Sequence, residues 1–280
     1  MKIIDARVRI PYKSFANAVI FKDSAAMNSW ASMFNMPRPP IVAGMDELFA
    51  DMERAGVSKV LVSCRRGQNV ENVDIAEACS LYSDKLCGFV EIDPKDGVKF
   101  GLEEIEKYVL NGPCSGVAIE PGFNRRGPLY ADDEQFYFIY DACEKNDIPL
   151  YLNFGGFIGP DYTYTDPDRL IQIVRTFPNL KMMIAHAAYP HILKIIHLAV
   201  ANPNIYVLPD MYGFDIPGGN MYIKAANTML KDQIVFGSAY PIFDIKSAAD
   251  YYMNCGLDEA VLPKIMAENV ENFLGLSKNK

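Results

Sequence analysis

The stretch MDELFADMERAGVSKVLVSC (residues 45–64) contains one amphipathic helix followed by one buried strand. Between Met45 and Glu53 the apolar residues recur at helical spacing, and Gly56 is a residue type that often ends a helix. The run Lys59–Cys64 is short, apolar and rich in β-branched residues, which predicts a strand. A helix that leads into a buried strand through a short turn is typical of a parallel α/β sheet.

The same alternation of short apolar runs and longer amphipathic segments continues along the chain and predicts eight βα units. Eight units favour a closed (β/α)8 TIM barrel, an α/β fold, formed as a single domain by residues 1–280. An open, doubly wound sheet is the structural alternative. The predicted strands are Ile3–Ile10, Lys59–Cys64, Leu86–Ile92, Ser115–Glu120, Leu150–Phe154, Lys181–His186, Ile205–Asp210 and Ile234–Ser238.

Composition narrows the class of protein. Half of the 280 residues are apolar, enough for a large core, and the net charge of −8 disfavours nucleic-acid binding. No segment is long and apolar enough to span a membrane, and Asp5, Arg7 and Arg9 interrupt the first apolar run, so no signal peptide is predicted. We therefore expect a cytoplasmic protein with reduced thiols, because no CxxC pair occurs among Cys64, Cys79, Cys87, Cys114, Cys143 and Cys255.

Two connections are long enough to suggest a functional face. Pro11–Ala43 follows the first predicted strand as a long loop insertion, and Gly155–Thr165 follows the fifth. Long loops after barrel strands form the active face. The first loop carries Trp30, the single tryptophan, among apolar residues, which predicts an apolar lid, a homodimer contact or simple packing across one end of the barrel.

Polar residues end several of the predicted strands and would meet at one mouth of the barrel. Arg7 and Arg9 are two residues apart in the first strand and therefore share a face. Two adjacent cations in a barrel require anionic partners or an anionic ligand. The other strand ends supply Arg65, Glu120, Asn153, His186, Asp210 and Tyr240.

Three of these residues can take part in proton transfer. Asp210 is a candidate base that activates water, His186 a candidate proton relay, and Glu120 a further catalytic candidate. Substrate binding is expected from Arg7, Arg9, Arg65, Asn153 and Tyr240. In a purely structural alternative, Asp210 and Glu120 only neutralise Arg7 and Arg9 as buried ion pairs.

Several blocks, in this order along the chain, resemble the amidohydrolase superfamily, in particular the branch that includes aminocarboxymuconate semialdehyde decarboxylases and pyrone dicarboxylate lactonases. The resemblance runs nearly from end to end and implies the barrel fold. It is carried by MKIID (residues 1–5), GFVEIDP (88–94), GVAIEPG (116–122), IAHAAYP (184–190), VFGSAYP (235–241) and ENVENFLGL (268–276).

The resemblance also implies a metal site, from which this chain departs. Metal-dependent members carry a His-x-His pair after strand one, histidines on strands five and six, and an aspartate after strand eight. The matching positions here are Arg7 and Arg9, Asn153, His186 and Ala239. Arginine and alanine cannot ligate a cation, so we predict no metal cofactor, with weak divalent-metal binding at His186 left open.

A small carboxylate-bearing molecule is the expected substrate. The leading hypothesis is metal-independent hydrolysis of a lactone, ester or amide, with Arg7 and Arg9 holding the carboxylate or oxyanion. The first alternative is non-oxidative decarboxylation of an unsaturated or aromatic acid, in which the arginines must bind a group other than the departing carboxylate. The second is a catalytically silent barrel that binds a small acid.

Overall fold

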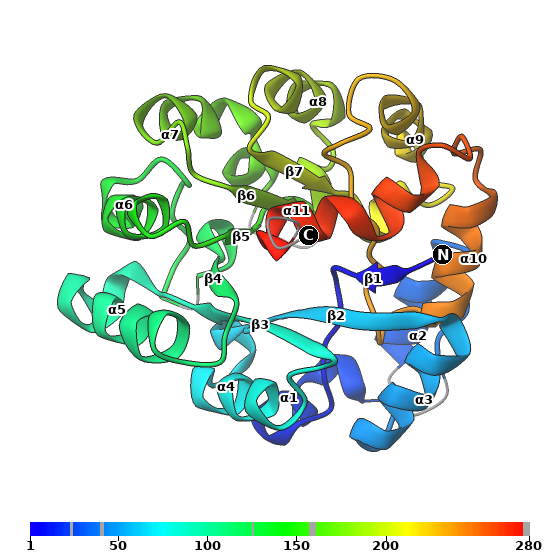
Figure 1. Cartoon of the computed structure of the whole chain (residues 1–280), viewed down its shortest axis with the longest axis horizontal. Helices are drawn as coiled ribbons and strands as arrows, with labels where there is room; N and C mark the ends of the chain where they lie inside the picture. Colours follow the sequence, from blue (N-terminus) through cyan, green and yellow to red (C-terminus); the bar gives the residue numbers. More distant parts are fainter. Residues whose placement is uncertain (23–24, 40–41, 125, 157–160, 277–280) are drawn as a thin grey trace.

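Seven parallel strands curl into a barrel that is ringed by helices in the computed structural model (Figure 1). The structure describes residues 1–22, 25–39, 42–124, 126–156 and 161–276. The side chain of Trp30 lies outside the described residues, and so does the role predicted for it. The strands are β1 (Ile3–Asp5), β2 (Val57–Ser63), β3 (Leu86–Glu91), β4 (Gly116–Ile119), β5 (Leu150–Asn153), β6 (Met182–Ala185) and β7 (Ile205–Leu208).

Each strand pairs with the next one in sequence order, which is the order of a TIM barrel. In the described part of the chain the helices are α1 (Lys13–Ala16), α2 (Ala25–Ser32), α3 (Met45–Ala55), α4 (Asn72–Leu81), α5 (Val98–Ile105), α6 (Tyr137–Lys145), α7 (Ile171–Thr176), α8 (Ile192–Ala201), α9 (Gly219–Asn227), α10 (Ile245–Asn254) and α11 (Asn269–Phe273). The barrel is confirmed, and seven of the eight predicted strands are observed as strands.

Short helical turns connect many of these elements. They are η1 (Val19–Phe21), η2 (Arg66–Gln68), η3 (Pro94–Asp96), η4 (Glu106–Leu110), η5 (Pro121–Phe123), η6 (Glu134–Phe136), η7 (Tyr162–Thr165), η8 (Pro167–Leu170), η9 (His186–Ala188), η10 (Asp210–Gly213) and η11 (Lys264–Glu268). Turns η2, η5, η9 and η10 begin within a few residues of the end of a strand, so they lie at the end of the barrel where the predicted site residues are found.

The predicted eighth strand closes the barrel without becoming a regular strand. The amide of Val235 donates to Val207 O on β7, and the amide of Ala6 donates to Phe236 O, both at 3.0 Å. The segment therefore connects β7 and the residue that follows β1 through isolated main-chain hydrogen bonds instead of a continuous ladder. The prediction of a regular strand over Ile234–Ser238 is wrong, although its place in the barrel is correct.

Asp5 explains why regular strand pairing ends early both after β1 and in the predicted eighth strand. Its fully buried carboxylate accepts the main-chain N–H of Arg7 and the main-chain N–H of Ser238, each at 2.9 Å. A side chain that takes up main-chain donors competes with strand pairing. The first strand therefore ends at Asp5 instead of continuing to Ile10 as predicted.

Helix α3 follows its predicted course. Asp46 and Glu47 lie in its first turn, where acidic side chains are favoured, and Met45, Leu48 and Met52 are buried. Gly56 ends the helix in the left-handed conformation, at φ 69°, which glycine adopts without steric cost.

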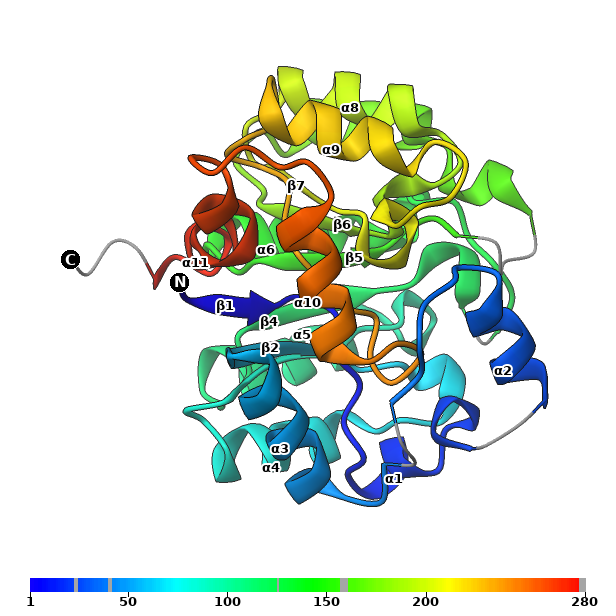
Figure 2. The ribbon, with the colours of Figure 1, turned by 90° about the vertical axis from the view of Figure 1, so that its right-hand side faces the viewer.

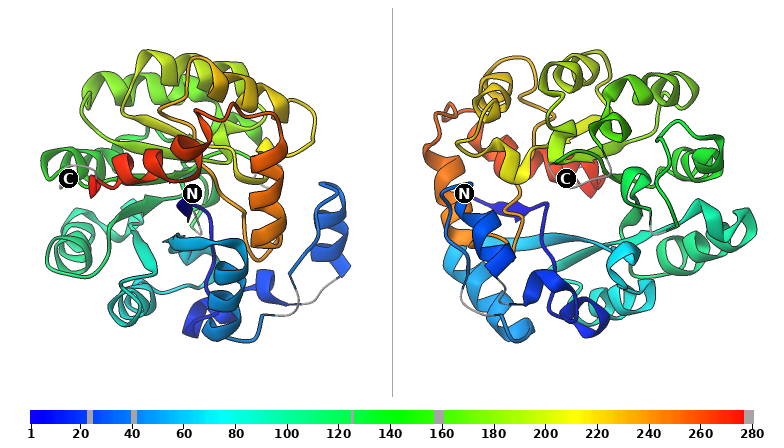
Figure 3. Two further views of the ribbon diagram at one scale, coloured as in Figure 1. Left: turned by 45° about the vertical axis from the view of Figure 1, so that its right-hand side comes forward. Right: turned by 180° about the vertical axis from the view of Figure 1, so that it is seen from behind.

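The two ends of the barrel differ. One apolar cluster fills the space between strands and helices, and a second fills the barrel interior, where Phe273 of α11 stacks on Phe89 with ring centroids 6.0 Å apart. Helix α11 thereby covers one end of the barrel, beside the N-terminus, while α2 lies at the opposite end (Figures 2 and 3). No helix in the described ranges is both long and apolar enough to cross a membrane.

Candidate active site

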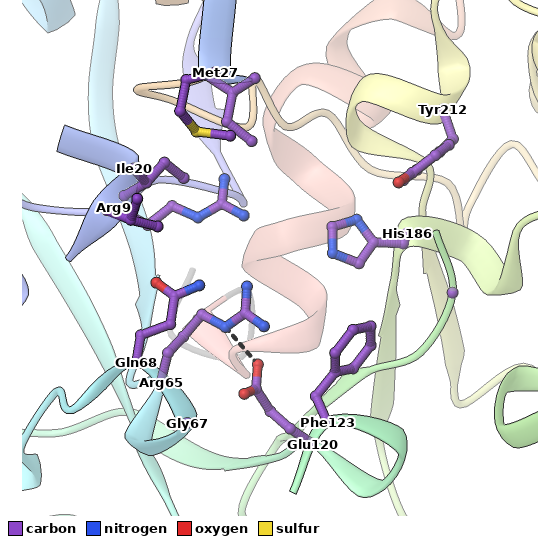
Figure 4. Close-up of a pocket in the computed structure, with 13 residues that line it drawn as sticks. Arg9, Ile20, Met27, Arg65, Gly67, Gln68, Glu120, Phe123, His186 and Tyr212 are labelled. Carbon is purple, nitrogen blue, oxygen red and sulfur yellow. Dashed lines mark ion pairs between the residues drawn. The ribbon is translucent and has the colours of Figure 1, made fainter. Parts of the chain in front are cut away.

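A cavity of about 300 Å³ lies at the strand ends, on the side of the barrel opposite α11 (Figure 4). The long connection after β1 covers part of it, through Val19 and Ile20 of η1 and Met27 of α2. The structure thus places this connection over the predicted active face. The lining residues are Arg9, Val19, Ile20, Met27, Arg65, Gly67, Gln68, Glu120, Phe123, Gly155, His186, Tyr212 and Ile242.

Two guanidinium groups dominate the polar wall of the cavity. Figure 4 shows those of Arg9 and Arg65 pointing into the same space, with the imidazole of His186 facing them. Glu120 is the carboxylate among the lining residues, and it pairs with Arg65 at 2.6 Å between Oε1 and Nε. The remaining wall is largely apolar, so a bound molecule would contact both charge and hydrocarbon.

Arg9 is a buried cation without an acidic partner. Its side chain is 4% exposed, and its Nη1 donates to the carbonyl of Ala239 at 2.9 Å. No carboxylate in the described part of the chain forms an ion pair with it. Burial, together with the positive charges of Arg7 and Arg65, holds the pKa of Arg9 well below its usual value. An anionic ligand in the cavity would relieve this unfavourable burial.

Arg7 does not line the cavity and is instead satisfied within the protein. Its Nη1 donates to Asn153 Oδ1 at 2.6 Å and to the hydroxyl of Tyr151 at 3.2 Å. Its Nη2 lies 2.9 Å from His186 Nε2, and its Nε lies 3.7 Å from Asp210 Oδ2. The structure therefore separates the two arginines that the sequence pattern groups together, because only Arg9 reaches the cavity.

His186 is held on both ring nitrogens. Its Nδ1 lies 2.7 Å from Asp210 Oδ2, and its Nε2 faces Arg7, which has no acceptor atom. Nε2 must therefore accept, and Nδ1 must carry the proton that is donated to Asp210. Burial is the main cause that lowers the pKa of His186 to about 4, and the charge of Arg7 adds to this effect. The imidazole is thus neutral at physiological pH.

The main chain is strained where three strand ends meet the site. His186, Asp210 and Ala239 have φ values of 64°, 45° and 64°, in the left-handed region that residues other than glycine rarely adopt. Such conformations persist only where the surrounding structure enforces them, and they occur often at functional sites. The strain supports the assignment of this end of the barrel to function.

Asp210 lies behind the cavity wall rather than on it. It is fully buried, and its carboxylate faces His186 and Arg7. The predicted role of Asp210 as the base that activates water requires contact with the cavity, which this position does not provide. The alternative of buried ion pairs holds for Asp210 with Arg7, whereas Glu120 pairs with Arg65 instead of Arg7 or Arg9.

Two predicted substrate-binding residues point elsewhere. Asn153 contacts Arg7 and is not among the lining residues. Tyr240 is fully buried, and its hydroxyl lies 3.2 Å from Asp51 Oδ2 on α3. Its side chain packs between the barrel and this helix, so Tyr240 does not reach the cavity.

The structure adds residues that the sequence pattern does not single out. Gln68, Phe123 and Tyr212 line the cavity from the turns η2, η5 and η10, which follow β2, β4 and β7. Their position within a few residues of predicted strand ends was a usable signal. Tyr151, which contacts Arg7, carried no comparable signal, because it lies inside an apolar strand.

Comparison with known proteins places this barrel in a family. A family model described as amidohydrolase matches residues 4–276, and the chain belongs to this amidohydrolase family. A curated relative, the gamma-resorcylate decarboxylase of Polaromonas sp. (strain JS666 / ATCC BAA-500), is 20% identical over 84% of this chain and 85% of its own.

Solved structures share the fold over nearly the whole chain. The TIM-barrel protein Bb4693 of Bordetella bronchiseptica matches with a TM-score of 0.90 and 30% identity over 100% of both chains. A 2,6-dihydroxybenzoate decarboxylase from Rhizobium matches with a TM-score of 0.68 and 17% identity over 99% of this chain and 98% of its own. A dihydroxybenzoic acid decarboxylase of Polaromonas sp. JS666, solved with bound manganese, matches with a TM-score of 0.65 and 17% identity over 99% of this chain and 97% of its own.

The residues of this site do not fit such a metal ion. Within the described ranges no group of three or more His, Cys, Asp or Glu side chains is arranged to hold one. The guanidinium of Arg7 already contacts both His186 and Asp210, and Glu120 on the cavity wall is paired with Arg65. A manganese site needs several convergent oxygen or nitrogen donors with free lone pairs.

Proposed function

We propose that this protein is a non-oxidative decarboxylase of a small aromatic or unsaturated carboxylic acid. The observation that carries the proposal is Arg9, a buried guanidinium that faces the cavity and has no acidic partner among the residues that the structure describes. Buried charges in proteins are normally paired, and a cation left unpaired at a cavity wall calls for an anionic ligand. The decarboxylases among the relatives support the choice of reaction.

The size and charge of the cavity suit a single-ring acid. Its volume of about 300 Å³ is at the lower end of the range of ~300–1,000 Å³ found for small-molecule sites. The lining carries two guanidinium groups against one carboxylate, so its formal charge favours an anion. Phe123, Ile20 and Ile242 offer flat or apolar surface for a ring or a conjugated chain.

The chemistry replaces a carboxylate by a proton at the same carbon. A proton is first added to the carbon that bears the carboxylate. The C–C bond to the carboxylate then breaks, carbon dioxide leaves, and the electron pair of that bond restores the conjugated system. Arg9 would oppose this step if it held the departing carboxylate, because it would stabilise the ground state. We therefore assign Arg9 to an oxygen substituent that gains negative charge as the bond breaks.

Glu120 is the group we assign to proton delivery. It is the carboxyl on the cavity wall, and Arg65 fixes its orientation through the 2.6 Å contact between Nε and Oε1. His186 is a weaker candidate, because its Nδ1 proton is directed at Asp210 and its Nε2 faces Arg7. General acids must come within hydrogen-bond reach of the reacting atom.

Hydrolysis receives less support from this arrangement. A metal-independent hydrolase needs a base at the cavity that can take a proton from water. Asp210, the residue predicted for this task, is fully buried behind His186 and is not among the residues that line the cavity. The named relatives that are decarboxylases point in the same direction.

The experiment is a turnover screen with carboxyl-¹³C-labelled acids, including 2,6-dihydroxybenzoate, salicylate and cinnamate. We expect release of labelled carbon dioxide, reduced at least 100-fold in Arg9→Met. Arg175→Met, on the exposed surface of α7, is the matched control and should retain full activity. Hydrolysis of lactones or esters that depends on Arg9, or thermal stabilisation by an acid without any turnover, would overturn the proposed reaction.

A further inference from the structure

The side chain of Arg7 is the centre on which three strand ends converge. Asn153 at the end of β5, His186 after β6 and Asp210 after β7 all direct an acceptor atom at its guanidinium. The hydroxyl of Tyr151 adds a fourth contact, at 3.2 Å from Nη1. Arg7 is 2% exposed, so this contact set is shielded from water.

These acceptors are atoms that a bound cation would otherwise use. A metal ion at this place would need the Nε2 lone pair of His186, a carboxylate oxygen of Asp210 and the amide oxygen of Asn153. The guanidinium already lies within 2.6 Å of Asn153 Oδ1 and 2.9 Å of His186 Nε2. Arginine stays protonated even when buried, so its charge is permanent.

We propose that Arg7 is the built-in cation of this site and takes the place of a divalent metal ion. In this role it is a positioning residue: it balances the buried charge of Asp210 and keeps His186 as a neutral imidazole whose Nε2 accepts a hydrogen bond. The inference concerns the same site as the proposed reaction but does not depend on which reaction occurs there.

Charge balance gives the inference a direct consequence. Without Arg7, the buried carboxylate of Asp210 would face His186, at 2.7 Å from Nδ1, and no other cation among the described residues is in contact with it. A buried negative charge favours the protonated form of an adjacent imidazole. The site should then replace the missing guanidinium charge with a proton on His186.

The test uses ¹⁵N-histidine NMR on the full chain, which contains only His186, His191 and His197. The His186→Gln variant assigns the signals. At pH 6.5 we expect neutral His186 with an unprotonated Nε2 in the wild type and in Arg7→Lys, which keeps a positive charge. In Arg7→Met we expect both ring nitrogens of His186 to be protonated.

Metal binding is measured in parallel by titrating chelator-treated protein with Mn²⁺ and Zn²⁺. We expect that neither ion binds to the wild type at His186, so the wild type and His186→Gln should give the same titration curve. Stoichiometric binding that His186→Gln abolishes would overturn the inference, and so would a neutral His186 in Arg7→Met. If Arg7→Met does not fold, the protonation of His186 in Arg7→Lys and the metal titration of the wild type still test the inference. No substrate is present, so these results stand apart from the turnover screen.

Discussion

His186 Nδ1 lies 2.7 Å from Asp210 Oδ2, in a pair of which His186 lines the cavity and Asp210 is buried behind it. Arg7 approaches the same imidazole from its other nitrogen, at 2.9 Å. The histidine is therefore fixed between an anion and a cation, and its neutral form is the one that satisfies both. This arrangement makes the charge state of His186 measurable through stability.

Because of His186, the free energy of unfolding should decrease as the pH is lowered. Its pKa is lowered to about 4 in the folded state, mainly by burial, from about 6.5 in the unfolded chain. Below pH 6.5 the unfolded chain binds a proton that the folded protein does not, so stability is lost as the pH falls from 6.5 towards 4. At ~1.4 kcal/mol per pKa unit the loss amounts to about 3.5 kcal/mol.

Urea unfolding of wild type and His186→Gln between pH 7.5 and 4.5 measures this effect. The free energy of unfolding of the wild type should fall more than that of His186→Gln as the pH is lowered. The comparison separates the effect of His186 from that of the acidic residues, which both proteins share. His197→Gln, on the exposed side of α8, is the control and should follow the wild type. A constant difference between wild type and His186→Gln would contradict the prediction.

Removing the charge of Asp210 should destabilise the protein strongly. Asp210→Asn keeps the shape of the side chain, and asparagine also tolerates the left-handed conformation at φ 45°. The substitution leaves Arg7 buried without its carboxylate, so we expect a loss of about 3–5 kcal/mol in unfolding free energy.

The control for this substitution is Asp250→Asn. Asp250 pairs with Lys246 on the surface of α10, where both side chains are at least 40% exposed. Exposed pairs of this spacing contribute about 0.3–0.5 kcal/mol. Chemical denaturation at pH 7 compares the two variants, and equal losses would show that the burial of Asp210 has no energetic consequence.

Substitution by methionine should have different effects on the free energy of unfolding at Arg7 and at Arg9. Arg7→Met leaves Asn153, His186 and Asp210 without their buried partner, and we expect a loss of about 3–5 kcal/mol. Arg9→Met removes a buried cation that has no carboxylate partner and costs one hydrogen bond to Ala239 O. We expect the second variant to be as stable as the wild type or more stable by about 1 kcal/mol.

Thermal and urea unfolding of both variants test this contrast. A loss of stability in Arg9→Met as large as that in Arg7→Met would mean that Arg9 is structural, and it would weaken its assignment to ligand binding. A stabilised Arg9→Met that no longer binds small acids is the result expected of a functional residue that is kept at the expense of stability.

The strands were predictable because short apolar runs alternate regularly with longer amphipathic segments. Leu86–Ile92 was predicted and β3 is Leu86–Glu91, and the helix that ends at Gly56 also has its predicted end. The ladders next to Asp5 were not predictable in this way. Their early end depends on a carboxylate that accepts main-chain donors from two segments more than 200 residues apart in sequence, which no local pattern reveals.

The sequence predicts which strand ends form the site. It does not predict which of their side chains line the cavity and which are engaged by other residues behind it. Arg7 and Arg9 have the same residue type and the same strand face, so alternation assigns them one role. Their difference arises from Tyr151 and Asn153, which engage Arg7 from across the barrel. The prediction that Tyr240 binds substrate fails for a related reason, because its hydroxyl contacts Asp51 on α3 and its side chain does not reach the cavity.

A double-mutant cycle should show strong coupling between Arg65 and Glu120. Their side chains are 13% and 1% exposed, and the 2.6 Å contact joins a guanidinium and a carboxylate at the cavity wall. Low exposure reduces screening by water, so we expect a coupling free energy of about 1–3 kcal/mol from Arg65→Met and Glu120→Gln. The pair Lys145–Asp141, with side chains 70% and 48% exposed, is the control and should give about 0.5 kcal/mol or less. Urea unfolding of the four proteins in each cycle gives the two values, and similar coupling in both pairs would show that the cavity wall is as well screened as the surface.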